Sequence, residues 1–264
     1  MSKRALRKII SILFFISILL ISYLELKNKI QEIKMEYTNR QIIEMKTNVK
    51  EPENGLKNSS VYWKAIERKD SYNNELQFYS TDNVVIKEDT IEIISKRETR
   101  DNKMYTSGLV ESTNAYKYGY FKFNIEISKG KGIFPAIWFL PNDGGGLPEI
   151  DLFEMIGSAP YTFYGVIHFQ KDGIQDSDYY TYEVPIKEEY SVSLKWTAKS
   201  ITWYIDGQEI YSTAQGVPQE YMYIIINQAI GGDWPGNPDN DTVFPNQFKI
   251  ISKQIEPIFK KGRD

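Results

Sequence analysis

Three acidic residues lie within one six-residue segment, Glu149-Ile150-Asp151-Leu152-Phe153-Glu154. In a β-strand the side chains alternate between the two faces, so Glu149 and Asp151 share a face. Glu154 reaches that face only if one extra residue, a β-bulge, interrupts the alternation. Carboxyl groups crowded together push the pKa of one of them upward, and an ionised carboxyl beside a protonated one is the arrangement that cleaves glycosidic bonds with retention of configuration. From these residues alone, the alternative is an acidic strand face in contact with solvent.

The elements that must position these acids are expected to be strands. Short runs rich in β-branched and aromatic residues recur at 83–86, 90–95, 118–127, 134–140, 161–170, 190–196, 201–205, 209–212 and 222–228. Asp206-Gly207 separates two of these runs, which is a strong signal for a hairpin. Closely spaced strands without helices between them indicate a sandwich or a jelly roll. We therefore expect an all-β fold, a jelly-roll β-sandwich of two antiparallel sheets, over residues 59–264.

Composition excludes several classes of site. The 264-residue chain has no cysteine and a single histidine, which rules out structural disulfides, cysteine metal sites and metal sites with several histidines. Its net charge of −3 provides no basic face for nucleic acid. Aromatic residues make up 14% of the chain, a richness that suits both a sandwich core and a carbohydrate-binding groove. About 200 residues remain after an N-terminal leader, enough for a single domain with a core of its own.

The N-terminal segment is typical of a targeting sequence. Residues 1–24 carry a basic flank with Lys3 and Arg4, followed by an apolar run from Ile9 to Leu24. This is either a cleaved signal peptide or a helical signal-anchor. No small-residue cleavage site follows the run, which favours an anchor that holds the rest of the chain at the extracellular face of the membrane; secretion is the alternative. We expect residues 25–58 to form a charged stalk, either partly helical or a disordered linker.

Further blocks of the sequence, taken in order, resemble glycoside hydrolase family 16, the laminarinase and lichenase group. Glu149–Glu154 is similar to the E-x-D-x-x-E signature of this family in its bulged form. The other matching blocks are 73–79 (NNELQFY), 105–108 (YTSG), 117–119 (KYG), 130–140 (GKGIFPAIWFL), 231–236 (GGDWPG) and 244–245 (FP). They follow the order of the family, and the resemblance covers about residues 63 to 250, nearly the whole domain.

The resemblance implies a role for each acid. Glu149 would be the nucleophile, Glu154 the general acid and base, and Asp151 would lie between them and tune their protonation. The concave sheet would form an open substrate cleft. We therefore expect a retaining, endo-acting hydrolase of β-1,3-glucan or mixed β-1,3-1,4-glucan. The alternatives are a transglycosylase, a hydrolase of a galactan, agar or carrageenan, and a non-catalytic glucan-binding module; crowded carboxyl groups disfavour the module.

Other residues are candidates for contacts with the sugar chain. Trp138 and Trp234 could be platforms on which sugar rings pack, with core packing as the alternative. Polar side chains that could bind sugar hydroxyls are Asn74, Glu75 and Asn227, and His168 resembles a histidine found beside the acids in the bulged subgroup.

The chain departs from the family at two positions. Leu109 follows Tyr105-Thr106-Ser107-Gly108 where many relatives carry arginine, so the resemblance does not assign this sugar subsite. Ile251-Ser252 lacks the aspartate that often lies beside a structural calcium. We therefore expect no cofactor and doubt the calcium. A polysaccharide is the expected partner of a monomeric protein.

Overall fold

The computed structural model describes residues Lys27, Lys29 and 63–263. The chain divides into two units, Met1–Pro52 and Glu53–Asp264. The predicted leader, 1–24, and all of the predicted stalk except Lys27 and Lys29, which are helical, lie outside the described residues. Among the described residues, no helix is long and apolar enough to cross a membrane.

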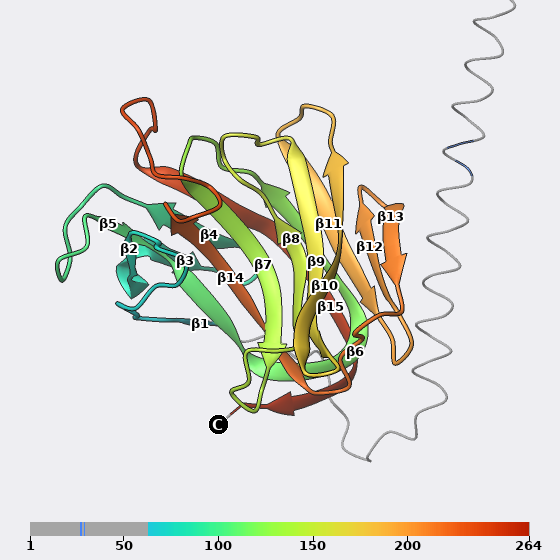
Figure 1. Ribbon diagram of the computed structural model, residues 1–264. Helices are drawn as coiled ribbons and strands as arrows, with labels where there is room; N and C mark the ends of the chain where they lie inside the picture. The colour runs from blue at the N-terminus through green and yellow to red at the C-terminus, as the bar shows by residue number, and fades with distance from the viewer. Residues whose placement is uncertain (1–26, 28, 30–62, 264) are drawn as a thin grey trace, which may run out of the picture. The chain divides into compact units, whose positions relative to one another are not determined.

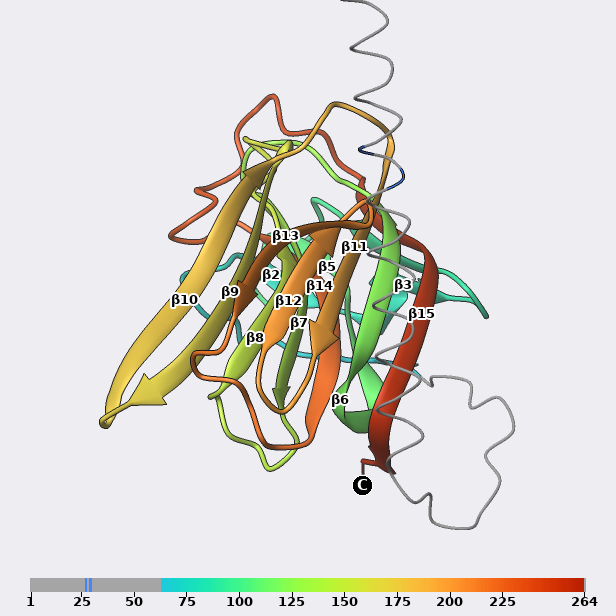
Figure 2. The same ribbon diagram turned by 90° about the vertical axis from the view of Figure 1, so that its right-hand side faces the viewer.

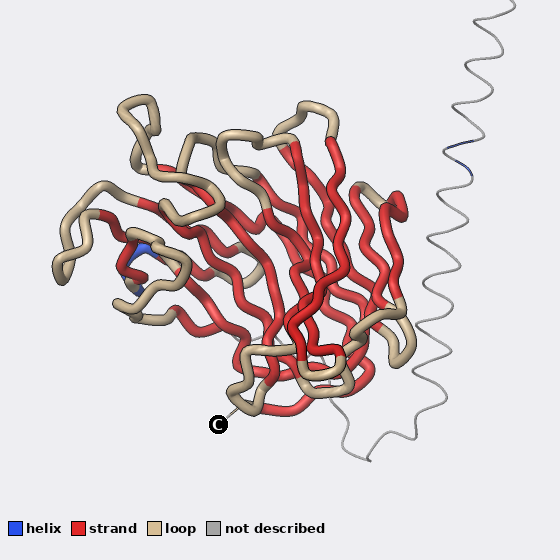
Figure 3. Tube along the Cα trace, viewed as in Figure 1, coloured by secondary structure: helices blue, strands red, loops and turns tan. Residues whose placement is uncertain are grey.

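The regular secondary structure of residues 63–263 is almost all strand, with loops between the strands (Figures 1 and 3). The elements are β1 Trp63–Ala65, β2 Gln77–Tyr79, η1 Thr81–Asn83, β3 Val84–Ile86, β4 Ile91–Ser95, β5 Tyr105–Ser107, β6 Leu109–Glu126, β7 Ile133–Pro141, β8 Glu149–Glu154, β9 Thr162–Lys171, β10 Ile174–Glu183, β11 Glu189–Trp196, β12 Ile201–Ile205, β13 Gln208–Thr213, β14 Met222–Ile230 and β15 Asn246–Gly262. The predicted all-β class is confirmed, and each predicted run overlaps a strand.

Two antiparallel layers are joined through the long strand β6. One layer runs in the order β10-β9-β8-β7-β14-β6, with β1 on the far side of β6. The other contains the second half of β6 with β11, β12 and β13 on one side and β15, β4 and β3 on the other. The first half of β6 pairs with β14 and the second half with β11, so the strand belongs to both layers. The predicted sandwich is thus confirmed; among the described strands, only β2 and β5 pair in parallel.

β6 changes layer at Tyr118 and Gly119, which have φ values of 62° and 147°. Glycine is needed here because a Cβ at residue 119 would lie 2.6 Å from the carbonyl oxygen of Glu256 on β15. Figure 2 shows β15 running beside β6 along this bend.

The core fills the space between the layers. Large side chains with no more than 1% exposure, among them Phe139, Phe153, Phe163, Trp196 and Trp203, form one apolar cluster. Phe163 contacts Phe153 and Tyr190 edge-on, with ring centroids 4.9 Å apart in each pair. Because such close-packed interiors yield little, this cluster is a rigid support behind β8 and β9.

The predicted runs do not include β1, β2, β5, β10, β15 or the first half of β6. β10 is an exposed, polar edge strand with no hydrophobic alternation, yet it pairs with β9 along its whole length. β15 runs from Asn246 to Gly262, because it follows β6 around the bend into the other layer.

Candidate active site

A β-bulge in β8 places the three acids on one face. Glu149 pairs with His168, Asp151 with Val166 and Glu154 with Tyr164, so the partners on β9 are two residues apart each time. The register shifts between Asp151 and Glu154. Leu152 and Phe153 are both buried in the core, at 1% exposure each. The predicted bulge is confirmed, and all three carboxyl groups lie on the face opposite the core.

Two hollows flank the acids, one on each side along the sheet. A hollow of about 430 Å³ extends over β7 and β14 and is lined by Arg68, Tyr79, Trp138, Asn227 and the three acids, among others. A second, of about 570 Å³, extends over β9 and β10 and is lined by Tyr164, His168, Tyr179 and Trp234 together with Glu149 and Glu154. Glu149 and Glu154 thus lie where the two hollows meet, which makes the concave face a continuous cleft.

The acids differ in how strongly their surroundings favour the protonated form. Burial raises the pKa of Glu154 well above its usual range, and the charges of Asp151 and Glu149 raise it further. Burial and the charge of Glu149 also raise the pKa of Asp151 well above its usual range. Burial raises the pKa of Glu149 as well, but the charge of His168 opposes that rise. Glu149 is therefore the best candidate for the ionised carboxylate, and Glu154 for the protonated acid.

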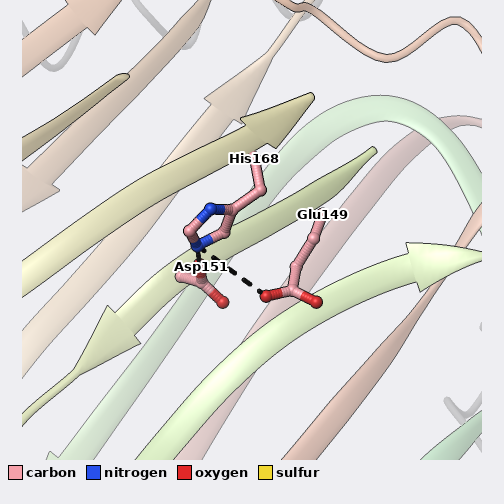
Figure 4. Close-up of side chains that lie close together, drawn as sticks. All are labelled: Glu149, Asp151 and His168. Carbon is pink, nitrogen blue, oxygen red and sulfur yellow. Dashed lines mark ion pairs between the residues drawn. The ribbon is translucent and has the colours of Figure 1, made fainter. Parts of the chain in front are cut away.

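His168 on β9 lies beside Glu149 and Asp151 (Figure 4). Its Nε2 is 3.4 Å from Asp151 Oδ2 and 4.0 Å from Glu149 Oε1. The Asp151 oxygen is buried and has no hydrogen-bond partner, so at 3.4 Å the imidazole contact is electrostatic. These three side chains offer ligand atoms within 4.8 Å of one another, and they are the one group found in the described part of the chain that could hold a metal ion.

The catalytic strand is held from behind by a buried tryptophan. Trp203 on β12 is fully buried, and its Nε1 donates a hydrogen bond of 2.9 Å to the carbonyl oxygen of Asp151. Tyr180 packs against the same indole, with centroids 5.9 Å apart. Gly165 makes room for both rings, since a Cβ there would lie 2.3 Å from Tyr180. The middle of β8 is therefore fixed to the second layer of the sandwich.

The two predicted platforms lie on opposite sides of the acids. Trp234 is 46% exposed in the 570 Å³ hollow, and Phe134 and Tyr164 contact it edge-on at 5.2 and 4.9 Å. Trp138 lines the 430 Å³ hollow, and its Nε1 donates to Asn227 Oδ1 at 2.8 Å. Both rings are thus oriented by neighbours before any ligand binds.

The polar residues predicted to bind sugar have different surroundings. Asn227 donates to the Tyr79 hydroxyl at 2.9 Å as well as accepting from Trp138, so its amide orients both rings. Glu75 lines both hollows; burial raises the pKa of this carboxyl, and Gln77 donates to it at 2.7 Å. Asn74 lines neither hollow.

Asn74 lines a separate hollow together with Lys103 and Asp233. The Asn74 side-chain amide donates a hydrogen bond of 2.8 Å to Asp233 Oδ1. The structure therefore brings together the three acids, His168, Glu75, Trp138, Asn227 and Trp234, and leaves Asn74 apart from the acids.

Several cleft residues escaped the sequence reasoning. Arg68 lines the smaller hollow with its guanidinium over the rings of Tyr72 and Tyr79, at 5.5 and 5.2 Å. Asn73 lines both hollows. Asn73 begins the block 73–79 that resembles the family, which was a signal for it, whereas nothing in the local sequence distinguishes Arg68 from a surface arginine. The structure also shows the two positions at which the sequence departs from the family pattern. Leu109 is fully buried, and the Ser252 hydroxyl accepts a hydrogen bond of 2.7 Å from the Asn124 side chain.

Comparison with known proteins identifies the family. The chain is 32% identical over 150 residues to "Endo-1,3-1,4-beta-glycanase EglC" of Rhizobium meliloti (strain 1021), covering 55% of this chain and 32% of that protein. It is 31% identical over 199 residues to "Glucan endo-1,3-beta-glucosidase A1" of Niallia circulans, covering 62% of this chain and 29% of that protein. The chain thus spans about a third of the length of these curated relatives.

Among solved structures, the laminarinase catalytic domain from Thermotoga maritima MSB8 is similar with a TM-score of 0.67 and 26% identity, covering 78% of this chain and 94% of that one. The family model of glycosyl hydrolases family 16 matches residues 56–245, which include every residue of the cleft described above. On the acids, the fold and this match together, the chain belongs to glycosyl hydrolases family 16.

Proposed function

We propose that this domain is a retaining, endo-acting hydrolase of β-1,3-glucan or mixed β-1,3-1,4-glucan. The observation that carries the proposal is the row of three carboxyl groups on the cleft face. Among them, the pKa of Glu154 is raised well above its usual range, and the pKa of Glu149 is raised least. Membership of the family supports the reaction class. The similarity to a glucan endo-1,3-β-glucosidase and an endo-1,3-1,4-β-glycanase supports the substrate class.

The proposed reaction has two steps. The Glu149 carboxylate attacks the anomeric carbon while Glu154 gives its proton to the leaving oxygen, so the glycosidic bond breaks and a glycosyl ester forms on Glu149. Glu154, now ionised, takes a proton from a water molecule, whose oxygen attacks the same carbon and releases Glu149. Asp151 lies between the two on β8, and its charge raises the pKa of Glu154, which favours the protonated form of that acid.

The shape of the cleft supports cleavage within chains. Hollows extend from the acids in both directions along the sheet, and each is lined by a tryptophan that we propose as a sugar platform. A cleft open on both sides accepts an internal stretch of polymer, whereas an exo enzyme needs a pocket that ends at one sugar. Rapid loss of viscosity before monosaccharide accumulates is therefore the expected behaviour.

A substrate panel tests the proposal. Laminarin, lichenan, agarose and carrageenan are digested in parallel, and the products are separated by size. We expect oligosaccharides from laminarin, lichenan or both, and none from the galactans. Products only from agarose or carrageenan would replace the glucan assignment, and binding without any product would indicate a non-catalytic module. Incubation with a purified glucan oligosaccharide tests for transfer: products longer than that oligosaccharide would indicate transglycosylation.

Chemical rescue tests the roles of the two glutamates. Loss of general acid catalysis typically costs about 10²–10⁴-fold, but less on an activated aryl glycoside, whose leaving group needs no proton. Glu154→Ala with azide should give a product of retained configuration. Glu149→Ala with azide should give the inverted product, because the anion attacks from the vacated side. The opposite stereochemical outcomes would reverse the two roles.

We also propose that the segment 1–24 anchors the domain at the outer face of the membrane. The support is the basic flank, the apolar run and the lack of a cleavage site in the sequence. The full-length protein should stay with the membrane fraction and keep its original N-terminus. A mature N-terminus near residues 25–35 would show instead that the segment is a cleaved signal peptide.

A further inference from the structure

The edge strand β10 presents an exposed aromatic ring to the cleft. Tyr179 is 62% exposed and lines the same hollow as Trp234. The catalytic mechanism proposed above gives this ring no part. The β9–β10 hairpin that carries it forms one side of the domain in Figure 2.

The register of the sheet places Tyr179 in line with the acids. Tyr179 pairs with Val166, Val166 with Asp151, and Asp151 with Trp138, so the four residues form one row across β10, β9, β8 and β7. Neighbouring strands are about 4.8 Å apart, so Tyr179 lies about 10 Å from Asp151, on the side opposite Trp138. A chain bound across the acids along this row passes Tyr179 beyond the sugar that reacts.

The back of β10 is fixed to the other layer of the sandwich. Asp178, which faces away from the cleft, accepts hydrogen bonds of 2.6 Å from both the Tyr211 hydroxyl and Thr213 Oγ1 of β13. Tyr180 packs beside Tyr211 at 6.2 Å and Trp203 at 5.9 Å. An edge strand with so many exposed residues would otherwise be easily displaced. These contacts hold the strand on both sides of Tyr179 in sequence.

We propose that Tyr179 is a sugar-binding platform at a distal subsite and that Asp178 is the positioning residue that holds it there. The proposal rests on the proposed function and deepens it, since it extends the bound chain onto β10. Sugar rings present C–H faces that pack on aromatic rings, and a pre-positioned ring loses little conformational entropy on binding. The occupant is a neutral β-linked glucan chain long enough to span from the acids to β10.

Removal of the ring tests the platform. Tyr179→Ala should raise KM for laminarin about 3- to 10-fold, the range expected for one aromatic contact, with kcat changed less than about 2-fold. Tyr179→Phe keeps the ring and should change KM less than about 2-fold. On the shortest oligosaccharide that the enzyme cleaves, Tyr179→Ala should behave as wild type. The matched control is Ile174→Ala, which removes a side chain 72% exposed on the same strand and outside the hollow.

Removal of the support tests the positioning role. Asp178→Ala should raise KM for laminarin in the same direction as Tyr179→Ala, and the double variant should show less than the product of the two effects, because both act through one contact. A lower Tm with unchanged KM would show that Asp178 is merely structural. Equal effects of Tyr179→Ala on long and short substrates would refute the distal subsite.

Affinity electrophoresis in gels containing laminarin separates this proposal from the proposed function, because retardation requires no turnover. Weaker retardation of Tyr179→Ala than of wild type supports the platform even if wild type hydrolyses nothing, in which case only the hydrolysis is refuted. Equal retardation of wild type and Tyr179→Ala, or no retardation of either protein, refutes the platform. The substrate panel then decides separately whether the domain hydrolyses glucan.

Discussion

Trp203→Phe should weaken both the fold and the catalytic strand. The indole Nε1 donates at 2.9 Å to the Asp151 carbonyl oxygen in the fully buried core, and phenylalanine keeps an aromatic ring but cannot donate. Leaving a buried acceptor without its donor costs about 1–3 kcal/mol. For a domain of this size, 1 kcal/mol corresponds to about 2–4 °C, so Tm should fall by about 2–12 °C, as measured by calorimetry.

Trp196→Phe is the matched control for this prediction. Trp196 is also fully buried, and its Nε1 donates to the Pro218 carbonyl oxygen at 3.2 Å, a contact with a loop rather than with β8. Both variants should lose stability to a similar degree. Only Trp203→Phe should also lower kcat, by up to about 10²-fold, because a displacement of β8 by 1 Å misplaces the reacting groups.

The assay must be run well below the Tm of both variants, so that loss of folded protein does not enter kcat. Equal kcat values for the two variants would refute the argument that the Trp203 bond positions the acids. A Tm for Trp203→Phe equal to that of wild type would refute the assigned energy of the hydrogen bond.

Glu154→Gln should stabilise the domain above pH 7. Because the pKa of Glu154 is raised in the folded state, the folded protein keeps a proton that the unfolded chain releases, so the free energy of unfolding of wild type falls as pH rises from about 4.3 to the raised pKa. Below that window the variant and wild type should be equally stable. The pH profile of kcat/KM should be bell-shaped, with Glu149 ionising on the acidic limb and Glu154 on the alkaline limb, and Glu154→Gln on an aryl glycoside should lose the alkaline limb; an unchanged limb would assign it to another group. EDTA should change Tm by less than about 2 °C, since the Ser252 hydroxyl bonds to Asn124 where an acidic calcium ligand was expected; a large fall would show a structural ion.

The parts of this protein that were predictable from its sequence are those in which local pattern and final position agree. β7, β9, β12 and β14 are rich in apolar residues because they are buried on one or both faces. The three acids were identifiable because the bulge follows from their spacing, once all of them must face the cleft.

The remainder depends on contacts between distant segments. Tyr179 lies on a strand that reads as a polar loop, and only its pairing with β9 turns it toward the hollow. Asn73 and Asn74 are adjacent and both have positive φ, yet the turn directs only Asn73 into the cleft. Arg68 enters the cleft because an isolated bridge joins it to Tyr79, eleven residues further along the chain. No periodicity in the sequence encodes these pairings.

The long strand β6 has a consequence for how the domain comes apart. Because β6, with β15 beside it, contributes hydrogen bonds to both layers, loss of its strand conformation removes hydrogen bonds from both. A change that disrupts β6 is therefore expected to weaken both layers together. We therefore expect the domain to melt as a single cooperative unit.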